Sequence, residues 1–253
     1  MNAYPKIKLE VTKGALIGGR WVAGSAGTFE VTNPHSGDVL HNVGRCDASD
    51  VEAAVAVARA AQPAWAALSV IERAQIMRKI HQIFLERAEP IAQMVTAEIG
   101  KPITDSREEV FEYSVPSWGK SAEEILRHRG LSFPSTQERT NNKRLVMNHR
   151  PLGVVAVITP YNFPTDISSI ALAHIAAAGN TVIWKPSEYS AVSCAMMSDV
   201  FKEAGLPDGV INVVQGFGDV GAALVESKGV DGVFFTGSTK TGRTIAEKCA
   251  LRP

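Results

Sequence analysis

The sequence predicts an α/β fold: a doubly wound parallel sheet with amino-terminal hairpins and helices and a projecting β-hairpin arm. Two observations support this prediction. From residue 151 onward, short β-branched runs alternate with segments of helical periodicity, and strands that alternate with helices form parallel sheets. Before residue 131, glycine and proline turns separate short strands, and amphipathic helical stripes follow them. We therefore divide the chain into residues 1–130, 131–150 and 151–253.

The first 130 residues are predicted to form hairpins and then helices. Turn-forming residues occur at positions 18–19 and 33–38. Two Ser-x-x-Glu capping boxes, at residues 49–52 and 69–72, predict helices that begin at their serines. We expect this region to be helical scaffolding that carries no chemistry.

Glycine and proline mark the later helices of the same region. Gly100, followed closely by Pro102, predicts the end of a third helix, after the one that begins at Ser69. A further helix is expected from about Ser106 to Arg129. It should be kinked at Pro116, because proline cannot donate the helical hydrogen bond.

Residues 131–150 are predicted to form a hairpin. Two extended segments, at 133–139 and 144–150, flank a polar loop at 140–143. Projecting polar hairpins often cross subunit boundaries, but a hairpin that simply lies on the surface is equally consistent with the sequence.

The last part of the chain predicts four strands, each followed by a helix. The strands are expected at 154–158, 181–184, 211–214 and 233–235, and the helices at 167–178, 190–204, 220–227 and 239–250. Ligands of such sheets bind at the carboxyl ends of the strands, so we searched there for chemistry.

The charge balance and the apolar content exclude two classes of partner. Lys and Arg number 26 and Asp and Glu number 26, so the formal net charge is zero, whereas a nucleic-acid binder needs a positive field. Apolar residues make up 45% of the chain, but no apolar run approaches the roughly 20 residues that span a bilayer. We expect neither a nucleic-acid nor a membrane partner.

Cysteine usage and the first residues predict a cytoplasmic protein. Cys46, Cys194 and Cys249 are odd in number and lack C-x-x-C spacing, so neither a disulfide framework nor a cysteine-rich zinc site is indicated. The six histidines are scattered, and we expect no metal. Residues 1–10 lack the apolar core of a secretion signal.

Two glycine-rich connections between a strand and a helix are candidate phosphate sites. Gly216, Gly218 and Gly221 form a G-x-G-x-x-G pattern, which is typical of a dinucleotide-binding turn. This pattern follows the third strand of its half instead of the first, so a plain glycine-rich connection is the alternative. Ser238, after Gly237, would begin the last helix, whose free N–H groups attract phosphate. An ordinary serine N-cap is the alternative there.

Polar residues follow the first two strands of the last part. Asn162 lies between Pro160 and Pro164, which restrict the loop, so its carboxamide is a candidate donor to an oxygen that gains negative charge. Lys185 and Glu188 follow the second strand, where a carboxylate can accept hydrogen bonds from ribose hydroxyls and repel a 2′-phosphate. The alternatives are an asparagine that satisfies loop backbone, and an exposed lysine and glutamate.

These motifs occur in an order that resembles a known family. The sequence combines Pro151-Leu-Gly-Val-Val, Ile-Thr-Pro-Tyr-Asn-Phe-Pro164, Gly179-Asn-Thr-Val, Lys-Pro-Ser-Glu188 and Phe235-Thr-Gly-Ser. Together they resemble the NAD(P)-dependent aldehyde dehydrogenase superfamily, and residues 17–22 resemble that family's opening hairpin. The resemblance covers nearly all of the chain and implies a Rossmann-like cofactor-binding fold.

The resemblance also implies roles for individual residues. Asn162 matches the family's oxyanion-hole carboxamide, and Lys185 and Glu188 match the pair at the adenosine ribose. The other matched residues are Ile158, Thr159, Pro160 and Tyr161 in the cofactor-facing loop, Gly218 and Gly221 on the adenosine side, and Phe235, Gly237 and Ser238 at the pyrophosphate.

The reaction implied by the resemblance is the oxidation of an aldehyde to a carboxylate with NAD, through a cysteine thiohemiacetal and a thioester. Glu188 favours NAD over NADP, because its carboxylate would face the 2′-phosphate of NADP. Residues 131–150 resemble the family's oligomerisation arm, which implies a homo-oligomer, either a dimer or a tetramer.

The sequence departs from the family pattern at its end. In the family, a Glu-Leu-Gly-Gly strand and the nucleophilic cysteine follow the Phe-Thr-Gly-Ser helix, and this sequence stops at Pro253. Its three cysteines lack the family's motif. We therefore expect the chain to supply the NAD site and Asn162 but not the nucleophile, and the isolated 253-residue chain to be inactive. The alternatives are a non-catalytic nucleotide-binding or interaction module from a truncated gene, and an acylating, CoA-dependent relative.

Overall fold

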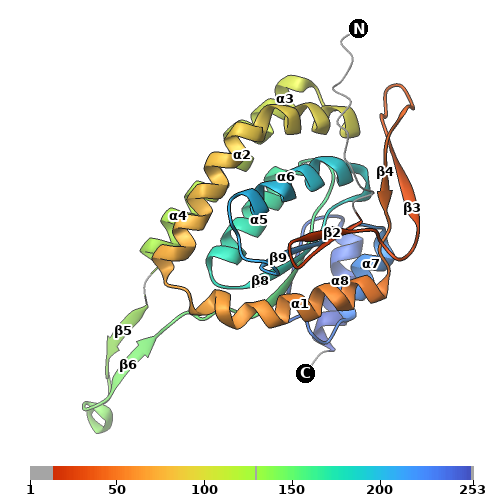
Figure 1. Cartoon of the computed structure of the whole chain (residues 1–253). Helices are drawn as coiled ribbons and strands as arrows, with labels where there is room; N and C mark the ends of the chain where they lie inside the picture. Colours follow the sequence, from red (N-terminus) through yellow and green to blue (C-terminus); the bar gives the residue numbers. More distant parts are fainter. Residues whose placement is uncertain (1–13, 129, 252–253) are drawn as a thin grey trace.

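The computed structural model describes residues 14–128 and 130–251 and has a six-stranded sheet at its centre (Figure 1). The strand order is β10-β7-β8-β9-β1-β2. The parallel strands are β7 (Val154–Ile158), β8 (Thr181–Lys185), β9 (Ile211–Val214) and β10 (Gly232–Phe235), and the antiparallel strands are β1 (Ala15–Ile17) and β2 (Arg20–Val22). The predicted doubly wound sheet is confirmed, and the first hairpin extends it on the β9 side.

Helices cover both faces of this sheet (Figure 1). One face carries α2 (Val70–Ile99), α4 (Val115–Arg127), α5 (Asp166–Ala177) and α6 (Ala191–Glu203), and the other carries α1 (Ala48–Ala67), α7 (Gly218–Glu226) and α8 (Thr239–Ala250). Within the described ranges, no single helix is long and apolar enough to cross a membrane. Helices α1 and α2 reach the required length and apolar content only when they are taken together, and the chain bends by 116° between them.

Strand β7 shows why the sequence predicted the sheet so well. Val155 and Val157 point into the hydrophobic core beneath α2, α5 and α6, whereas Val154 and Ala156 point into the core beneath α1 and α7. A parallel strand that is covered on both faces needs apolar side chains in both directions. The uninterrupted β-branched run therefore marks a buried strand, and its bounds match the prediction.

The first helix begins two residues earlier than its predicted capping box. Asp47 is the N-cap of α1; its side chain accepts hydrogen bonds from the backbone N–H groups of Ser49 and Asp50, and Asp50 completes the box. The prediction that Ser49 is the cap was wrong: Asp47, two residues upstream, is an equally good N-cap residue, and Asp50 lies at the position that completes its box. The box of Ser69 and Glu72 at the start of α2 is confirmed.

The helix predicted from Ser106 is instead a composite of three segments. It runs through α3 (Ile103–Arg107), a π-helix, η1 (Glu108–Ser114), and α4. The expected kink at Pro116 is replaced by this wide turn, in which the Val115 N–H donates to a carbonyl five residues back, at Val110. Because proline lacks an N–H, it is accommodated at the start of α4. Arg129, the predicted helix end, lies outside the described residues, as do residues 1–10.

Two hairpins lie outside the central sheet. Strands β3 (Thr28–Thr32) and β4 (Val39–Gly44) form one of them. The predicted arm is formed by β5 (Leu131–Pro134) and β6 (Arg144–Met147), which project from the body (Figure 1). Its strands are shorter than predicted, because a 3-10 turn, η2 (Glu138–Thr140), occupies the tip.

A buried carboxylate joins α2 to the start of α6. Glu98 accepts hydrogen bonds from the backbone N–H groups of Val192 and Ser193, at 2.7 and 2.8 Å. These bonds and the helix dipole favour the charged form, but desolvation outweighs them and raises the pKa of Glu98 to about 7. Folding therefore favours the protonated form of Glu98, and the folded chain keeps this proton at pH values where the unfolded chain has lost it.

We predict that Glu98→Gln makes the folded state less sensitive to pH. The unfolded chain loses the Glu98 proton near the ordinary pKa of 4.5 and the folded chain near 7, so the wild-type free energy of unfolding falls as pH rises between these values. Relative to Glu98→Gln, it should fall by about 1–3 kcal/mol between pH 5 and 8. Urea titrations of both proteins across this range measure the difference.

The matched control is Glu52→Gln, which removes an exposed carboxylate from α1. Its free energy of unfolding should follow that of the wild type across the same pH range. A constant difference between wild type and Glu98→Gln from pH 5 to 8 contradicts the prediction.

Candidate cofactor and oxyanion site

The carboxyl ends of three neighbouring strands meet at one edge of the sheet and carry the predicted site residues. Ile158, the last residue of β7, is in register with Lys185 on β8 and with Phe235 on β10. The chain leaves β7 towards α5 on one face and leaves β10 towards α8 on the other face. Where neighbouring connections diverge in this way, they leave the crevice in which such sheets bind ligands.

A cavity of about 300 Å³ opens between α7 and α8 at this edge. Five of the predicted cofactor residues line it together: Ile158, Lys185, Glu188, Gly218 and Gly221. Its remaining wall is formed by Ala222 and Val225 of α7 and by Thr241, Thr244, Ile245 and Lys248 of α8. An apolar cavity with a few polar groups at its rim is typical of small-molecule sites.

Lys185 and Glu188 form the polar rim of this cavity. The Lys185 ammonium donates to the Pro186 carbonyl at 2.9 Å and lies 3.4 Å from a carboxylate oxygen of Glu188. Burial lowers the pKa of Lys185, and the neighbouring Glu188 offsets part of that effect. The alternative of an exposed pair is wrong, because Lys185 is buried and Glu188 is only half-exposed.

Gly221 keeps the cavity open beside these two residues. A Cβ at this position would lie 3.7 Å from Lys185 Cδ and 3.8 Å from Ile158 Cδ1, so a larger side chain would fill the space between them. The glycine-rich pattern does join a strand to a helix, since β9 precedes it and α7 begins at Gly218. These glycines therefore border a cavity that fits a flat apolar group with polar substituents.

A second, more open hollow of about 470 Å³ lies at the start of α8. Phe235, Gly237 and Ser238 line it. Ser238 is the N-cap of α8, and its hydroxyl accepts a hydrogen bond from the Thr241 N–H at 3.1 Å. The N-cap alternative is thus confirmed, while the phosphate contact of Ser238 stays a prediction.

The loop at residues 159–164 carries Asn162 at the same edge. Asn162 is exposed, and its carboxamide makes no hydrogen bond to the part of the chain that the structure describes. The alternative, in which this side chain satisfies loop backbone, is therefore wrong. Tyr161 packs edge-on against Tyr189 with ring centroids 5.5 Å apart, so the loop touches the turn that holds Glu188.

Sequence reasoning missed one wall of the cavity. Thr241, Thr244, Ile245 and Lys248 recur at intervals of three and four residues along α8. Residues at this spacing share one face of a helix, so the pattern was available in the sequence. It was overlooked because ligand residues were expected at the carboxyl ends of the strands and at the start of the helix, and these residues lie further along α8.

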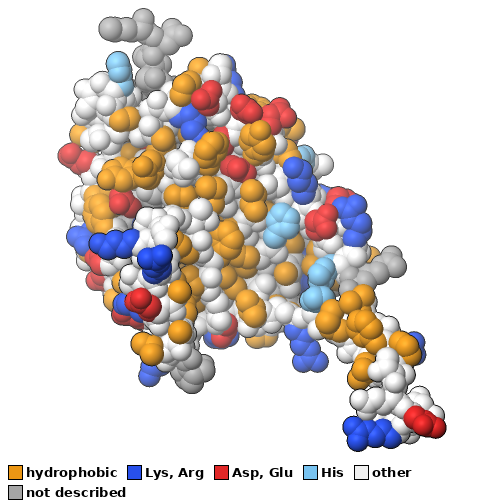
Figure 2. All heavy atoms as spheres, turned by 180° about the vertical axis from the view of Figure 1, so that it is seen from behind, with side chains coloured by type: hydrophobic (Ala, Val, Ile, Leu, Met, Phe, Trp, Pro, Cys, Tyr) orange, Lys and Arg blue, Asp and Glu red, His pale blue; other side chains and the backbone are white. Residues whose placement is uncertain are grey.

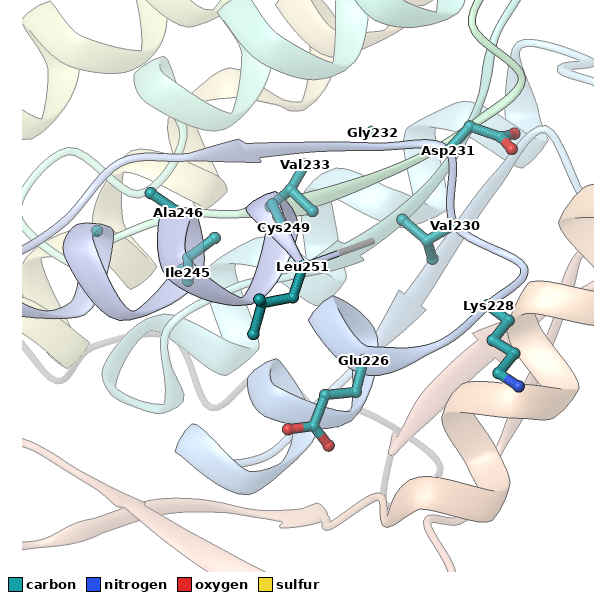
Figure 3. Close-up of a pocket in the computed structure, with 11 residues that line it drawn as sticks. Glu226, Lys228, Val230, Asp231, Gly232, Val233, Ile245, Ala246, Cys249 and Leu251 are labelled. Carbon is teal, nitrogen blue, oxygen red and sulfur yellow. The ribbon is translucent and has the colours of Figure 1, made fainter. Parts of the chain in front are cut away.

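The thiols of the described residues do not resemble a reactive nucleophile, although Cys194 Sγ lies 3.9 Å from the carbonyl of Pro164 in the Asn162 loop. Cys46 and Cys194 are buried, and desolvation raises the pKa of Cys46 to about 12 and that of Cys194 well above its ordinary value. Cys249 lies in a groove of about 1020 Å³ between α8 and the edge strand β10 (Figure 3). Across residues 14–128 and 130–251, no three His, Cys, Asp or Glu side chains are grouped to bind a metal ion.

The comparison with protein families identifies the chain. The model of the aldehyde dehydrogenase family matches residues 21–253. The chain belongs to this family. The resemblance predicted from the strand-end motifs is confirmed.

Aldehyde dehydrogenases of known sequence match most of this chain. The N-succinylglutamate 5-semialdehyde dehydrogenase of Burkholderia lata is 39% identical over 244 residues, which cover 94% of this chain and 48% of that relative. The protein of the same name from Paraburkholderia xenovorans is 37% identical over 244 residues. The chain thus spans about half the length of the curated relatives it matches.

Solved aldehyde dehydrogenase structures share the fold. An NAD+ complex of an aldehyde dehydrogenase from Bacillus cereus has a TM-score of 0.92 at 34% identity, and the match covers 99% of this chain and 51% of that chain. An NADP-dependent enzyme from E. coli has a TM-score of 0.90 at 37% identity, with 94% and 49% covered. The neighbours therefore include proteins named for each cofactor.

We predict that only Cys249 reacts in the folded 253-residue chain. A thiolate is the reactive species, and burial with a raised pKa suppresses it at Cys46 and Cys194. A disulfide reagent should label one thiol per native chain and three after unfolding, and Cys249→Ser should abolish the native labelling. Rapid native labelling of Cys194, or NADH formation from aldehydes by this chain, would contradict the prediction that the buried thiols are unreactive.

Proposed function

We propose that this chain binds NAD and supplies the oxyanion donor for the oxidation of an aldehyde to a carboxylate by the protein to which it belongs. The observation that carries the proposal is the cavity between α7 and α8, whose rim is formed by Lys185 and Glu188 and which lies at the same sheet edge as Asn162. Family membership supports the aldehyde as the class of substrate.

The cavity is the proposed adenosine site. Its apolar walls suit the flat base, and the rim offers a carboxylate that accepts from ribose hydroxyls beside an ammonium that donates. The hollow at Phe235, Gly237 and Ser238 is the proposed pyrophosphate position, because the first N–H groups of α8 and the positive end of its dipole face it. The loop of Thr159, Pro160 and Tyr161 would border the nicotinamide side.

Asn162 is the proposed catalytic residue of this chain. Its carboxamide is exposed, has no partner within the described ranges, and can donate to an aldehyde oxygen that becomes negative. NAD, when bound, would supply the acceptor for the hydride that the substrate loses. We assign the nucleophile that forms the thiohemiacetal and thioester to none of the described thiols. Cys194 contacts the loop at Pro164, but burial raises its pKa well above the ordinary value, as it does for Cys46. Cys249 lies in the groove beside β10.

NAD is the proposed cofactor in preference to NADP, because of Glu188. The 2′-phosphate of NADP would bring about two negative charges to this carboxylate and displace one of its hydrogen bonds. Lys185 offsets only part of that repulsion, because its ammonium is already held by the Pro186 carbonyl.

The three free thiols also favour a reducing cytoplasm as the protein's location.

We predict that the 253-residue chain binds NAD more tightly than NADP by about 10- to 150-fold, which corresponds to about 1.5–3 kcal/mol for a charge-assisted hydrogen bond. Glu188→Thr should bring the two dissociation constants close together. Isothermal titration calorimetry with both cofactors measures the ratio.

Glu247→Thr is the matched control, because it removes the same charge from an exposed position of α8 outside the cavity. Its NAD-to-NADP ratio should equal that of the wild type. A wild-type preference for NADP, or a ratio unchanged by Glu188→Thr, would exclude Glu188 as the selecting residue. Failure to bind either cofactor would refute the proposed function.

The arm is proposed to pair this chain with a second copy in a homo-oligomer. Both of its strands are exposed throughout, and they present apolar side chains at Leu131, Phe133, Leu145, Val146 and Met147. Hydrophobic side chains are visible along the projecting hairpin in Figure 2. Exposed apolar surface of this kind marks interaction sites.

We predict that Phe133→Ser combined with Leu145→Ser lowers the oligomeric state. These two residues face each other across the hairpin, so the pair removes apolar surface at one level of both strands. Sedimentation velocity should show a smaller species than the wild type at equal concentration. Lys143→Ser, in the loop before β6, is the control and should sediment as the wild type; an unchanged state in the double variant contradicts the role of the arm.

A further inference from the structure

A buried glutamate from the π-helix holds the end of the Asn162 loop. Glu109 is 0% exposed. One of its carboxylate oxygens accepts three hydrogen bonds: from the Thr165 N–H and hydroxyl, each at 2.8 Å, and from the Asp166 N–H at 3.2 Å. These groups lie where the loop ends and α5 begins. The carboxylate therefore fixes the backbone three and four residues after Asn162.

Lys101 binds the other oxygen of the same carboxylate. Its ammonium lies 2.5 Å from Glu109 and 3.7 Å from the centroid of the Phe163 ring. A cation over an aromatic face is attracted by the ring, more strongly where water is excluded. Lys101 thus contacts the carboxylate that holds the loop end and, at the same time, the side chain next to Asn162.

The π-helix brings Glu109 to this position. The Ser114 hydroxyl, at the end of the same wide turn, lies 2.9 Å both from the Glu109 carbonyl and from the Thr165 hydroxyl. The turn therefore contacts the loop end through two side chains, Glu109 and Ser114. Single π-turns within helices often occur at functional sites.

The opposite end of the loop is fixed by a second buried network. The Trp184 indole N–H donates to the Thr159 hydroxyl at 2.9 Å, and that hydroxyl lies 2.9 Å from the Ser168 hydroxyl. Ser168 in turn donates to the Pro164 carbonyl at 2.6 Å, so this network also reaches the end of the loop that Glu109 holds. Since the Asn162 carboxamide has no hydrogen bond of its own in the described chain, its direction depends on these two anchors.

We propose that Glu109 and Lys101 are positioning residues, which aim the Asn162 carboxamide by holding the loop end through Thr165 and Phe163. The purpose of this arrangement rests on the proposed function, in which Asn162 stabilises an oxyanion. A donor contributes most when it is already in place before charge develops. The buried ion pair of Glu109 and Lys101 supplies this preorganisation, although neither residue lines the cofactor cavity.

A purely structural role is the competing explanation, since a carboxylate at the start of a helix also stabilises that helix. The chain offers a matched control for it. Glu98 is likewise a buried glutamate that accepts two backbone N–H groups, but it caps α6 and lies at Val192 and Ser193. Replacing either glutamate removes a helix cap, but only Glu109 hydrogen-bonds the residues that end the Asn162 loop.

The test uses the 253-residue chain and two readouts at the loop. The first is the side-chain amide resonance of Asn162 in ¹⁵N-labelled protein, assigned by its loss in Asn162→Asp. The second is backbone hydrogen exchange of residues 159–167, measured by mass spectrometry. We expect Glu109→Gln to move or broaden the Asn162 resonance and to speed local exchange about tenfold. Glu98→Gln should change neither.

Lys101 variants keep the test decisive if Glu109→Gln does not fold. Lys101→Met should move the Asn162 resonance in the same direction as Glu109→Gln, and Lys101→Arg, which restores a cation, should return it towards the wild type. An Asn162 resonance and local exchange that are unchanged in the Glu109 and Lys101 variants overturn the proposal. An equal change in Glu98→Gln overturns it as well, because it assigns the effect to general loss of stability.

NAD titration of the same samples separates this proposal from the proposed function. If the wild type binds NAD and Glu109→Gln shifts Asn162, both are supported. If the wild type does not bind NAD while Glu109→Gln still shifts Asn162, the positioning proposal stands and the proposed function fails. If NAD binds and Asn162 does not respond to either variant, the positioning proposal alone fails.

Discussion

The parallel ladder of β10, β7, β8 and β9 is the constraint on which the rest of the molecule depends. Strands β7, β8 and β9 are covered on both faces, so their side chains point alternately into the two hydrophobic cores. The ladder also aligns Ile158, Lys185 and Phe235 at a single edge. Because the connections after β7 and β10 depart to opposite faces, the topology places a crevice between them, and Gly221 keeps the cavity beside it open.

The first backbone N–H groups of α5 and α6 donate hydrogen bonds to glutamates from other helical segments. Glu109 serves the start of α5, and Glu98 serves the start of α6. Buried N–H groups are costly to leave without partners, and here the partners come from elements distant in sequence. The helical region before residue 131 is thus bound to the sheet edge by buried charge as well as by apolar packing.

Much of the fold could be predicted from the sequence because its signals are local. The bounds of β7, β9 and α8 match the prediction, since burial on both faces and helical periodicity are expressed in consecutive residues. The start of α1 was missed because Asp47 and Ser49 are both good N-cap residues. The Ser-x-x-Glu spacing favoured Ser49, whereas the box that forms pairs Asp47 with Asp50.

The candidate site also contains residues that could be predicted from the sequence and residues that could not. Asn162, Lys185 and Glu188 could be located because they directly follow strands. Glu109 could not, because its hydrogen-bond partners lie 56 and 57 residues further along the chain and no short motif connects them. The prediction that residues 1–130 carry no chemistry failed to anticipate this contact. Long-range polar pairs of this kind become visible only when the backbone path is known.

The π-helix places an unusual demand on the length of the chain. A wide turn contains one residue more than an α-helical turn would need, so deleting any residue of Glu108–Ser114 would leave a more regular helix. It would also change the spacing between Glu109 and Ser114, which both contact Thr165 from the two ends of the wide turn, so that they could not keep these contacts together. In evolutionary terms, this segment can exchange residues far more easily than it can lose one.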